Sequence, residues 1–352
     1  MSDRHDNIIR DRIRAAAAQS TPLVVRGGGS KDFLGRHTEG EVLDVSALRG
    51  IVRYEPTELV ITARAGTPLA EVEAALAERG QMLGFEPPHF GPAATLGGTI
   101  ACGLSGPARP FRGAARDFVL GVKIVNGGGE ILRFGGEVMK NVAGYDVSRL
   151  MCGAYGTLGA LLEISLKVLP RPAAEAFLVL DLDDEDARGR MTGWQREPLP
   201  LAGLCYDGDR LHVRLSGAEQ AVAAARRRVG GESDPAGADF WNRLREQRGG
   251  FFAGNGELWR LSVPPTTGAL PLDGKQLVDW GGALRWVKTT APADTLFAAA
   301  AAAGGHAMRF RGAQDGAVFQ PLPAPLLALH RRLRQAFDPH GILNRGRLYP
   351  DL

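Results

Sequence analysis

Cysteines are few in this sequence, and they are widely spaced. Cys102, Cys152 and Cys205 are the only three in a chain of 352 residues, and no two of them form a CxxC pair. This number excludes a disulfide framework, and it excludes an all-cysteine iron–sulfur cluster, which needs four thiolates. The spacing is typical of a protein from a reducing compartment.

Long hydrophobic runs are also missing. No stretch approaches the ~20 apolar residues of a transmembrane helix. The first residues, MSDRHDNIIRDRIR, are too highly charged for a signal peptide. We therefore expect a soluble, cytoplasmic protein without a transmembrane segment, and we leave open a peripheral association with the inner face of the membrane through a complex.

Basic charge is not concentrated anywhere along the chain. Lys+Arg amount to 42 and Asp+Glu to 39, which gives a net charge of +3. A nucleic-acid surface would need a continuous basic stripe, so nucleic acid is not an expected partner. The seven histidines, at positions 5, 37, 89, 212, 306, 330 and 340, form no HxH or HxxxH pair, so no metal site is expected.

Two common nucleotide-binding motifs are absent as well. The sequence contains no GxGxxG, the fingerprint of a Rossmann domain, and no GxxxxGK[ST], the phosphate loop of nucleoside triphosphatases. Gly29-Ser30-Lys31 has serine and lysine in the reverse of the order that the phosphate loop requires. A nucleoside triphosphatase is therefore disfavoured.

Glycine, by contrast, is abundant and clustered. It makes up 47 of the 352 residues, about 13% against a usual ~7%. In the first half of the chain it gathers at 27–29, 97–98, 103 and 106, 127–129, 135–136, and 153, 156 and 159. Each cluster alone is most simply a turn, but several such loops in one domain can surround an anionic diphosphate with main-chain N–H groups.

The hydrophobic pattern divides the chain into three parts. Residues 1–172 contain strands, glycine turns and a hairpin at 126–129, and they end at the proline pair 170 and 172. Residues 173–324 contain two sets of strands and helices, which predict an antiparallel sheet with helices on one face. Residues 325–352 contain an amphipathic helix at 326–337 and a loop. The predicted fold class is therefore α+β.

Six motifs occur in a characteristic order. They are Leu23-Val-Val-Arg-Gly-Gly-Gly-Ser30, Pro92-Ala-Ala-Thr-Leu-Gly-Gly-Thr-Ile100, Arg116-Asp-Phe-Val-Leu-Gly121, Lys140-Asn-Val-Ala-Gly-Tyr-Asp146, Gly153-Ala-Tyr-Gly-Thr-Leu-Gly159 and Phe337-Asp-Pro-His-Gly-Ile-Leu-Asn344. The set resembles the vanillyl-alcohol-oxidase (PCMH) family of FAD proteins, in its FAD-linked oxidase branch. This resemblance implies a two-part FAD-binding domain and a smaller cap domain with an antiparallel sheet and helices.

The resemblance also implies a cofactor site. Gly27, Gly28, Gly29 and Ser30 would contact the FAD diphosphate. A second group would line the other side of the diphosphate, the ribose and the isoalloxazine: Thr95, Leu96, Gly97, Gly98, Gly103, Ser105 and Gly106. Asn344 would reach the flavin from the tail, although a turn asparagine is the simpler reading of that residue alone. Arg26, Asp117 and Gly159, from the same motifs, complete the predicted set.

The residue that follows the first glycine cluster bears on how the flavin is held. Many members of the family carry there a histidine that bonds covalently to the flavin, whereas this sequence has Ser30-Lys31. Cys102 follows the second cluster, but a lone cysteine is more often a small packing residue. We therefore expect non-covalent FAD.

Catalytic residues are not evident from the sequence. The resemblance to the FAD-linked oxidase branch implies oxidation of a 2-hydroxy acid, which needs a cation for the carboxylate and a base for the hydroxyl proton. The candidates are Arg285, His306, Arg309 and Arg311. The alternative interpretation is that they are solvated residues at a sheet edge. Their role stays open.

The resemblance extends to function. Within the family, the short middle domain and residues 140–146 resemble the smaller FAD-binding subunits of glycolate oxidases, whose partners are a larger FAD-binding catalytic subunit and an iron–sulfur subunit. A self-sufficient FAD-dependent 2-hydroxy acid oxidoreductase and a scaffold with a vestigial flavin site are the alternatives. Trp241, Phe251, Phe252 and Trp259 are the expected partner-contact residues, with core packing as the simpler reading.

Overall fold

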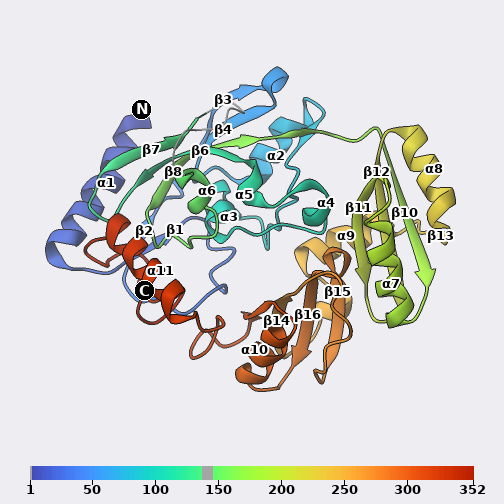
Figure 1. The fold of residues 1–352 in the computed structure, drawn as a ribbon. Coiled ribbons are helices and arrows are strands. Elements are labelled where there is room, and N and C mark those ends of the chain that lie inside the picture. The colour runs from blue at the N-terminus through green and yellow to red at the C-terminus, as the bar shows by residue number, and fades with distance from the viewer. Residues whose placement is uncertain (1, 137–145) are drawn as a thin grey trace. The chain divides into compact units, whose positions relative to one another are not determined.

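The computed structural model describes residues 2–136 and 146–352 (Figure 1). The chain forms two compact units, which are described separately. Unit 1 consists of Met1–Ser105, Ala114–Pro170 and Pro321–Leu352, and unit 2 consists of Gly106–Gly113 and Arg171–Gln320. In the described ranges, no helix combines the length and the hydrophobicity that a membrane span requires.

Unit 1 is built around a five-stranded antiparallel sheet with the order β3-β4-β8-β6-β7, and two short sheets pair β1 with β2 and β5 with β9. Its strands are β1 (Leu23–Arg26), β2 (Glu41–Asp44), β3 (Ile51–Glu55), β4 (Val60–Arg64), β5 (Gln81–Met82), β6 (Val119–Val125), β7 (Ile131–Gly135), β8 (Ala160–Lys167) and β9 (Leu169–Pro170). Its helices are α1 (Ser2–Gln19), η1 (Pro56–Glu58), α2 (Leu69–Ala77), α3 (Leu96–Cys102), α5 (Ala115–Phe118), α6 (Val147–Leu150) and α11 (Ala324–Phe337).

The hairpin of β6 and β7 is confirmed, and its turn shows why the sequence forms it. The side-chain oxygen of Asn126 accepts the N–H groups of Gly128 and Glu130, at 3.1 and 2.9 Å. Gly129 has a φ of +72°, a conformation that glycine adopts without a steric penalty. The turn therefore joins the two strands tightly.

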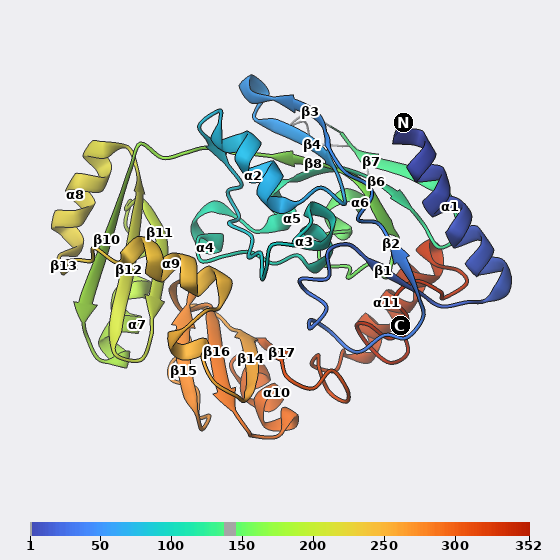
Figure 2. The same cartoon turned by 180° about the vertical axis from the view of Figure 1, so that it is seen from behind.

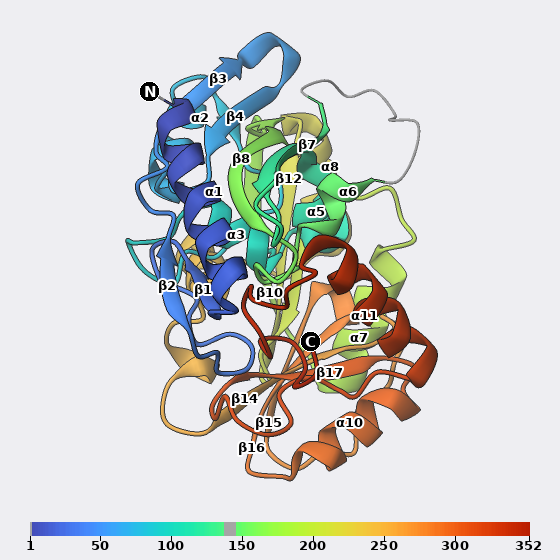
Figure 3. The same ribbon diagram turned by 90° about the vertical axis from the view of Figure 1, so that its left-hand side faces the viewer.

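Helix α1 is held on this unit by apolar and charged contacts. Ile9 and Ile13 are buried in a cluster with residues of β1 and β2. Asp6, only 1% exposed, forms ion pairs with Arg64 of β4 and Lys123 of β6. Figure 3 shows α1 running beside β4 and β8. An interior salt bridge therefore connects the N-terminal helix to the central sheet.

The C-terminal loop returns to β1. The buried carboxylate of Asp338 accepts the N–H groups of Ile342 and Leu343, at 3.1 and 2.9 Å. Leu343 then forms a parallel bridge with Leu23. A Cβ at Gly127 would lie 2.2 Å from Asp338 Oδ1, so no side chain fits there. The tail thus lies beside the strand that enters the first glycine cluster.

Unit 2 contains an eight-stranded antiparallel sheet with the order β13-β10-β12-β11-β15-β16-β14-β17. Its strands are β10 (Ala174–Asp181), β11 (Leu201–Tyr206), β12 (Arg210–Gly217), β13 (Glu232–Ser233), β14 (Glu257–Ser262), β15 (Lys275–Asp279), β16 (Leu284–Thr289) and β17 (His306–Arg311). Its helices are α4 (Arg109–Arg112), α7 (Asp184–Trp194), α8 (Glu219–Val229), α9 (Gly237–Glu246), η2 (Gly250–Phe252), η3 (Trp280–Gly282) and α10 (Ala293–Ala302).

Helices cover both faces of this sheet (Figures 1 and 2). Helices α7 and α8 bury their apolar sides against Leu204 and Leu211. Helix α9 packs on the opposite face, where the indole of Trp241 would lie 2.7 Å from a Cβ at Gly203. The prediction that helices lie on one face is therefore wrong for α9, because this glycine leaves room for a tryptophan on the other face.

Candidate functional site

The first two glycine clusters lie against each other. β1 ends at Arg26, and the following loop packs on the loop that leads into α3. A Cβ on Gly28 would lie 1.5 Å from the carbonyl oxygen of Ala93, and a Cβ on Gly27 would lie 2.6 Å from Thr95 Oγ1. Neither position has room for a side chain, so two segments far apart in the sequence form one continuous backbone surface.

The backbone of the first loop presents a row of free N–H groups. Among the described residues, the amides of Gly27, Gly28, Gly29 and Ser30 donate to no acceptor. Gly29 has a φ of +72°, and all four residues are partly exposed. Successive N–H groups around a left-handed residue form a concave site for an anion. This loop is therefore suited to a diphosphate.

Two cations flank this loop. Lys31 is only 6% exposed, and its Nζ lies 3.2 Å from the carbonyl oxygen of His89 and 3.3 Å from Ser30 Oγ. At the other end of the loop, Arg26 pairs with Asp32 at 2.6 Å. The charge of Arg26 is balanced by Asp32, whereas Lys31 adds positive charge at its end of the row of free amides and strengthens the attraction for an anion.

The second cluster has a different role from the first. Thr95 caps α3, because its Oγ1 accepts the N–H of Gly98 at 3.2 Å. The N–H groups of Leu96 and Gly97 donate to backbone carbonyls, at 2.9 and 2.7 Å. These three amides are thus engaged within the protein. At Gly98, in contrast to Gly28, a Cβ would contact nothing within 4 Å except Thr95 Oγ1, at 3.2 Å.

The glycine cluster at 153, 156 and 159 packs on the end of α3. Gly103 ends this helix with a φ of +63°, and a Cβ there would lie 3.0 Å from the backbone of Gly153. A Cβ on Gly159 would lie 3.0 Å from the carbonyl oxygen of Val125 in β6. In the part of the chain that the structure describes, the N–H groups of Gly156 and Leu158 have no acceptor although both residues are buried. Buried N–H groups are nearly always paired, so these two favour a ligand beside this loop.

Asn344 joins the tail to two of these segments. Its Oδ1 accepts the N–H of Val25 at 2.7 Å, and its Nδ2 donates to the carbonyl of Tyr155 at 2.6 Å. Asn344 is only 6% exposed and has a φ of +43°. Its side chain therefore holds β1, the glycine cluster at 153–159 and the tail together. Direct contact of this side chain with the flavin stays a prediction.

Three other predicted site residues have structural partners. Ser105 Oγ and a carboxylate oxygen of Asp117 accept N–H groups at the start of α5, at 2.9 and 2.8 Å. Gly106 belongs to unit 2, where its carbonyl accepts the indole N–H of Trp280 at 3.0 Å. The motif at 140–146 lies outside the described residues, except for Asp146, which caps α6.

The three arginines among the catalytic candidates each have a partner within unit 2. Arg285 is 1% exposed and donates to a backbone carbonyl at 2.8 Å, and burial lowers its pKa to about 10. Arg309 pairs with a glutamate of β14 at 3.1 Å, and Arg311 donates to a glutamine side chain at 3.1 Å. A shared carboxylate clamp is therefore not supported for the three arginines.

His306 lies near a concentration of positive charge that the sequence did not reveal. The guanidinium carbons of Arg109 and Arg260 lie 4.4 and 4.9 Å from the ring centroid of Trp280. Desolvation lowers the pKa of His306, and the charges of Arg260 and Arg109 lower it further. These residues come from α4, β14, η3 and β17, so only the folded chain brings them together.

The aromatic residues expected at a partner surface are divided by the fold. Trp241 and Trp259 are buried, at 4% and 0% exposed, and pack in the interior of unit 2. The expectation is therefore wrong for these two residues, because an interior side chain cannot meet another protein. Phe251 and Phe252 are half-buried.

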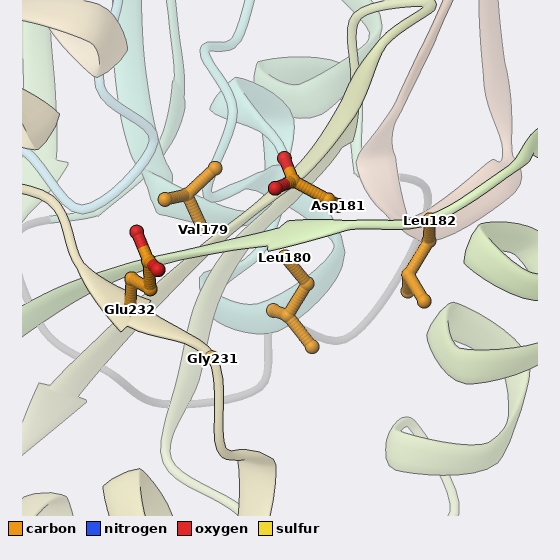
Figure 4. A pocket seen from close by; sticks show the side chains of 6 residues that line it. All are labelled: Val179, Leu180, Asp181, Leu182, Gly231 and Glu232. Carbon is orange, nitrogen blue, oxygen red and sulfur yellow. The ribbon is translucent and has the colours of Figure 1, made fainter.

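A pocket at the edge of unit 2 does not suit an anionic cofactor. Its volume is about 270 Å³. Figure 4 shows Val179 and Asp181 on one side of β10 and Leu180 on the other, with Glu232 nearby. The lining holds two carboxylates and no basic side chain, and the nearby Arg210 is already paired with Asp181 at 3.1 Å, so nothing in the lining attracts a phosphate. Among the described residues, no group of three or more His, Cys, Asp or Glu side chains could hold a metal ion.

Comparison with known protein families and sequences gives a consistent result. A family described as an FAD binding domain matches residues 4–135. Glycolate oxidase subunit GlcE of Escherichia coli is 52% identical over 348 residues, which cover 99% of this chain and 98% of that protein. Glycolate oxidase subunit GlcD of Bacillus subtilis is 30% identical over 53% of this chain and 40% of its own length.

Two further comparisons extend this set. D-2-hydroxyglutarate dehydrogenase of Xanthomonas citri pv. viticola is 31% identical over 60% of this chain and 45% of its own length. Among solved structures, alkyldihydroxyacetonephosphate synthase has a TM-score of 0.67 and 16% identity, and the match covers 96% of this chain and 74% of that one. This last likeness concerns the fold alone.

Proposed function

Because the chain belongs to the PCMH-type family of FAD-binding oxidoreductases, alongside glycolate oxidase subunit GlcE, we propose that it is the FAD-binding subunit of a glycolate oxidase. The observation that carries this proposal is the row of four free N–H groups from Gly27 to Ser30. Bound FAD supplies the acceptor for the two electrons that leave a 2-hydroxy acid on oxidation.

The residues of unit 1 fit this cofactor. The amides of the first loop would hold the diphosphate, and Lys31 would add positive charge at one end of the loop. The open space beside Gly98 leaves room for a ligand on α3. Asn344 would fix the relative positions of the surrounding segments through its bonds to two backbones.

We propose further that this subunit acts with a larger FAD-binding catalytic subunit and an iron–sulfur subunit. Three cysteines cannot supply the four thiolates of an all-cysteine iron–sulfur cluster in this chain. The three arginine candidates are already engaged by groups of unit 2, which favours substrate oxidation on a partner. The complex is proposed to lie in the cytoplasm, at the inner face of the membrane. A self-sufficient 2-hydroxy acid oxidoreductase is the second candidate, and the group of Arg109, Arg260 and His306 favours it.

Purification of the single chain separates these functions. We expect a yellow protein that does not oxidise glycolate with a soluble dye, and that gains activity when it is produced together with its partner subunits. A yellow and fully active single chain would support the self-sufficient enzyme. A colourless but folded chain would support a scaffold with a vestigial flavin site. Absorbance at 450 nm and dye reduction measure the two properties.

The flavin should be released by acid precipitation of the holoprotein. Burial raises the pKa of Cys102 to about 11, with the charges of Lys31 and Arg347 as smaller opposing effects. Its thiol is therefore protonated at neutral pH, and a thiol is a weak nucleophile compared with a thiolate. We expect the yellow colour in the supernatant. Colour in the washed pellet would contradict non-covalent binding, and mass spectrometry would then be directed to Cys102.

A further inference from the structure

Unit 2 contains a pocket of its own. Its volume is about 570 Å³, within the range of ~300 to 1,000 Å³ that is usual for small-molecule sites. The lining comes from the turn between β11 and β12, helix α9, the turn at 248–252 and the start of β15. All these segments belong to unit 2, so the pocket is complete within it.

Aromatic rings form one wall of this pocket. Phe240 stacks on His212, with 3.7 Å between ring centroids and an angle of 11° between ring planes. Phe251 and Phe252 pack edge to face at 5.2 Å. Lys288 fixes the turn that follows them, because its Nζ donates to two carbonyls at 2.7 and 3.3 Å. These rings offer an ordered surface on which a planar group can stack.

Two basic side chains in the lining keep their charge available. Arg248 donates to the neutral side chain of Asn242 at 2.9 Å. Lys275 is exposed and, within the described residues, forms no ion pair or hydrogen bond through its ammonium group. A third cation, Arg243, is paired with Asp239 at 3.0 Å. An anion entering the pocket would therefore meet Arg248 and Lys275.

The lining also holds two carboxylates, Asp207 and Asp209. Asp207 accepts two backbone N–H groups and a bond from His212 at 3.0 Å, and despite burial these bonds lower its pKa to about 2. It is therefore ionised, but both of its oxygens are engaged within the protein. The two carboxylates equal Arg248 and Lys275 in number, so an anion would be held here by direct contact with the cations and with backbone donors and not by a net positive charge.

The backbone adds donors beside Arg248. The N–H groups of Gly249, Gly250 and Phe251 have no acceptor in the ranges that the structure describes. Gly249 and Gly250 have φ values of +64° and +48°. Three successive free amides with left-handed residues form an anion site, and here they adjoin both an arginine and the aromatic wall.

We propose that this pocket binds a planar aromatic ring linked to a phosphate, the chemistry of a mononucleotide. The phosphate lies on the amides of Gly249, Gly250 and Phe251 and is neutralised by Arg248 and Lys275. The ring stacks within the wall of phenylalanines. This site goes beyond the proposed glycolate oxidase function and does not depend on it.

Calorimetric titration of the FAD-loaded full chain with AMP tests the proposal. We expect saturable binding with a Kd below ~1 mM, and binding of adenosine or of inorganic phosphate at least ~10-fold weaker, because each lacks one half of the ligand. The double variant R248A/K275A and the variant F251A should each weaken AMP binding at least ~10-fold. Arg227→Ala, an exposed arginine of α8 outside the lining, is the matched control and should leave it unchanged.

Three results would overturn the proposal. They are the absence of AMP binding at 5 mM (~5-fold above the expected limit), equal affinity for AMP in the lining variants, and release of the bound FAD by AMP, which would place the probe in unit 1. Flavin content is measured separately for each variant. Failure of the flavin assignment would therefore appear as colourless protein, whereas failure of this pocket would leave the protein yellow.

Discussion

The Gly28→Val variant is expected to be purified without flavin. Because a Cβ at Gly28 would lie 1.5 Å from the carbonyl oxygen of Ala93, the first loop must move away from the second. The row of free amides depends on this loop conformation, so we expect FAD to bind at least ~100-fold more weakly, a loss of about 2.7 kcal/mol. The ratio of absorbance at 450 and 280 nm, and titration of apoprotein with FAD, measure the effect.

The Gly98→Val variant tests flavin binding separately from the stability of the fold. A Cβ there has only Thr95 Oγ1 nearby, at 3.2 Å, so the empty protein should fold with little change in its melting temperature. Flavin should still be lost, because the side chain would extend into the space assigned to the ligand. Gly189→Ala, on α7 with nothing within 4 Å of its Cβ position, is the matched control and should stay yellow. Full flavin content in both Gly28→Val and Gly98→Val would show that the diphosphate lies elsewhere.

Some strands and turns of unit 1 could be predicted because they depend on residues that are close together in the sequence. The strand before the first glycine cluster and the β6–β7 hairpin follow from apolar runs and from turn residues such as Asn126. Helix α9 of unit 2 was missed because it begins at a glycine and lacks a side-chain cap. Its place on the sheet depends on Gly203, more than thirty residues earlier in the chain.

The site was less predictable because its contacts join distant segments. The bond between Asn344 and Val25 spans 319 positions. Glycine clusters indicate backbone segments that pack closely, but they do not show which amides already donate a hydrogen bond. Gly97 donates to a carbonyl, whereas Gly28 donates to none among the described residues. Gly106 was grouped with Gly103 from the sequence, yet it belongs to unit 2. Only the fold separates these cases.

A buried group of charges joins α1 to the central sheet. Asp6 pairs with Arg64 and, at 2.5 Å, with Lys123. Glu163 of β8 completes the group at 2.8 Å from Arg64 and 3.8 Å from Lys123. All four side chains are at most 8% exposed. Removal of one member would leave interior charge without compensation, which is costly in a region that water does not reach.

Asp6→Ala is expected to lower the free energy of unfolding by about 3 to 5 kcal/mol at neutral pH, the usual cost of breaking a buried ion pair. Without its carboxylate, the two interior cations share a single anion, Glu163, which also pairs with the exposed Arg133 at 3.2 Å. Urea unfolding monitored by circular dichroism measures the change. Asp11→Ala, on the same helix, is the control: its pair with Arg10 is on the surface, and such pairs are worth about 0 to 1 kcal/mol.

The effect of Asp6 should also depend on pH with a defined sign. Burial alone would raise the pKa of Asp6, but the hydrogen bonds and charges of Arg64 and Lys123 outweigh it and lower the pKa below the usual value. The folded protein therefore releases this proton more readily than the unfolded chain, whose Asp pKa is about 3.9. The stabilisation is fully present above that pH and is lost as the pH falls through the lower pKa of the folded state. The difference between wild type and Asp6→Asn should be constant from pH 7 to about 5 and decrease below about 4. A difference that grows on acidification would show that the carboxylate is protonated in the folded protein and that the ion pairs do not stabilise it.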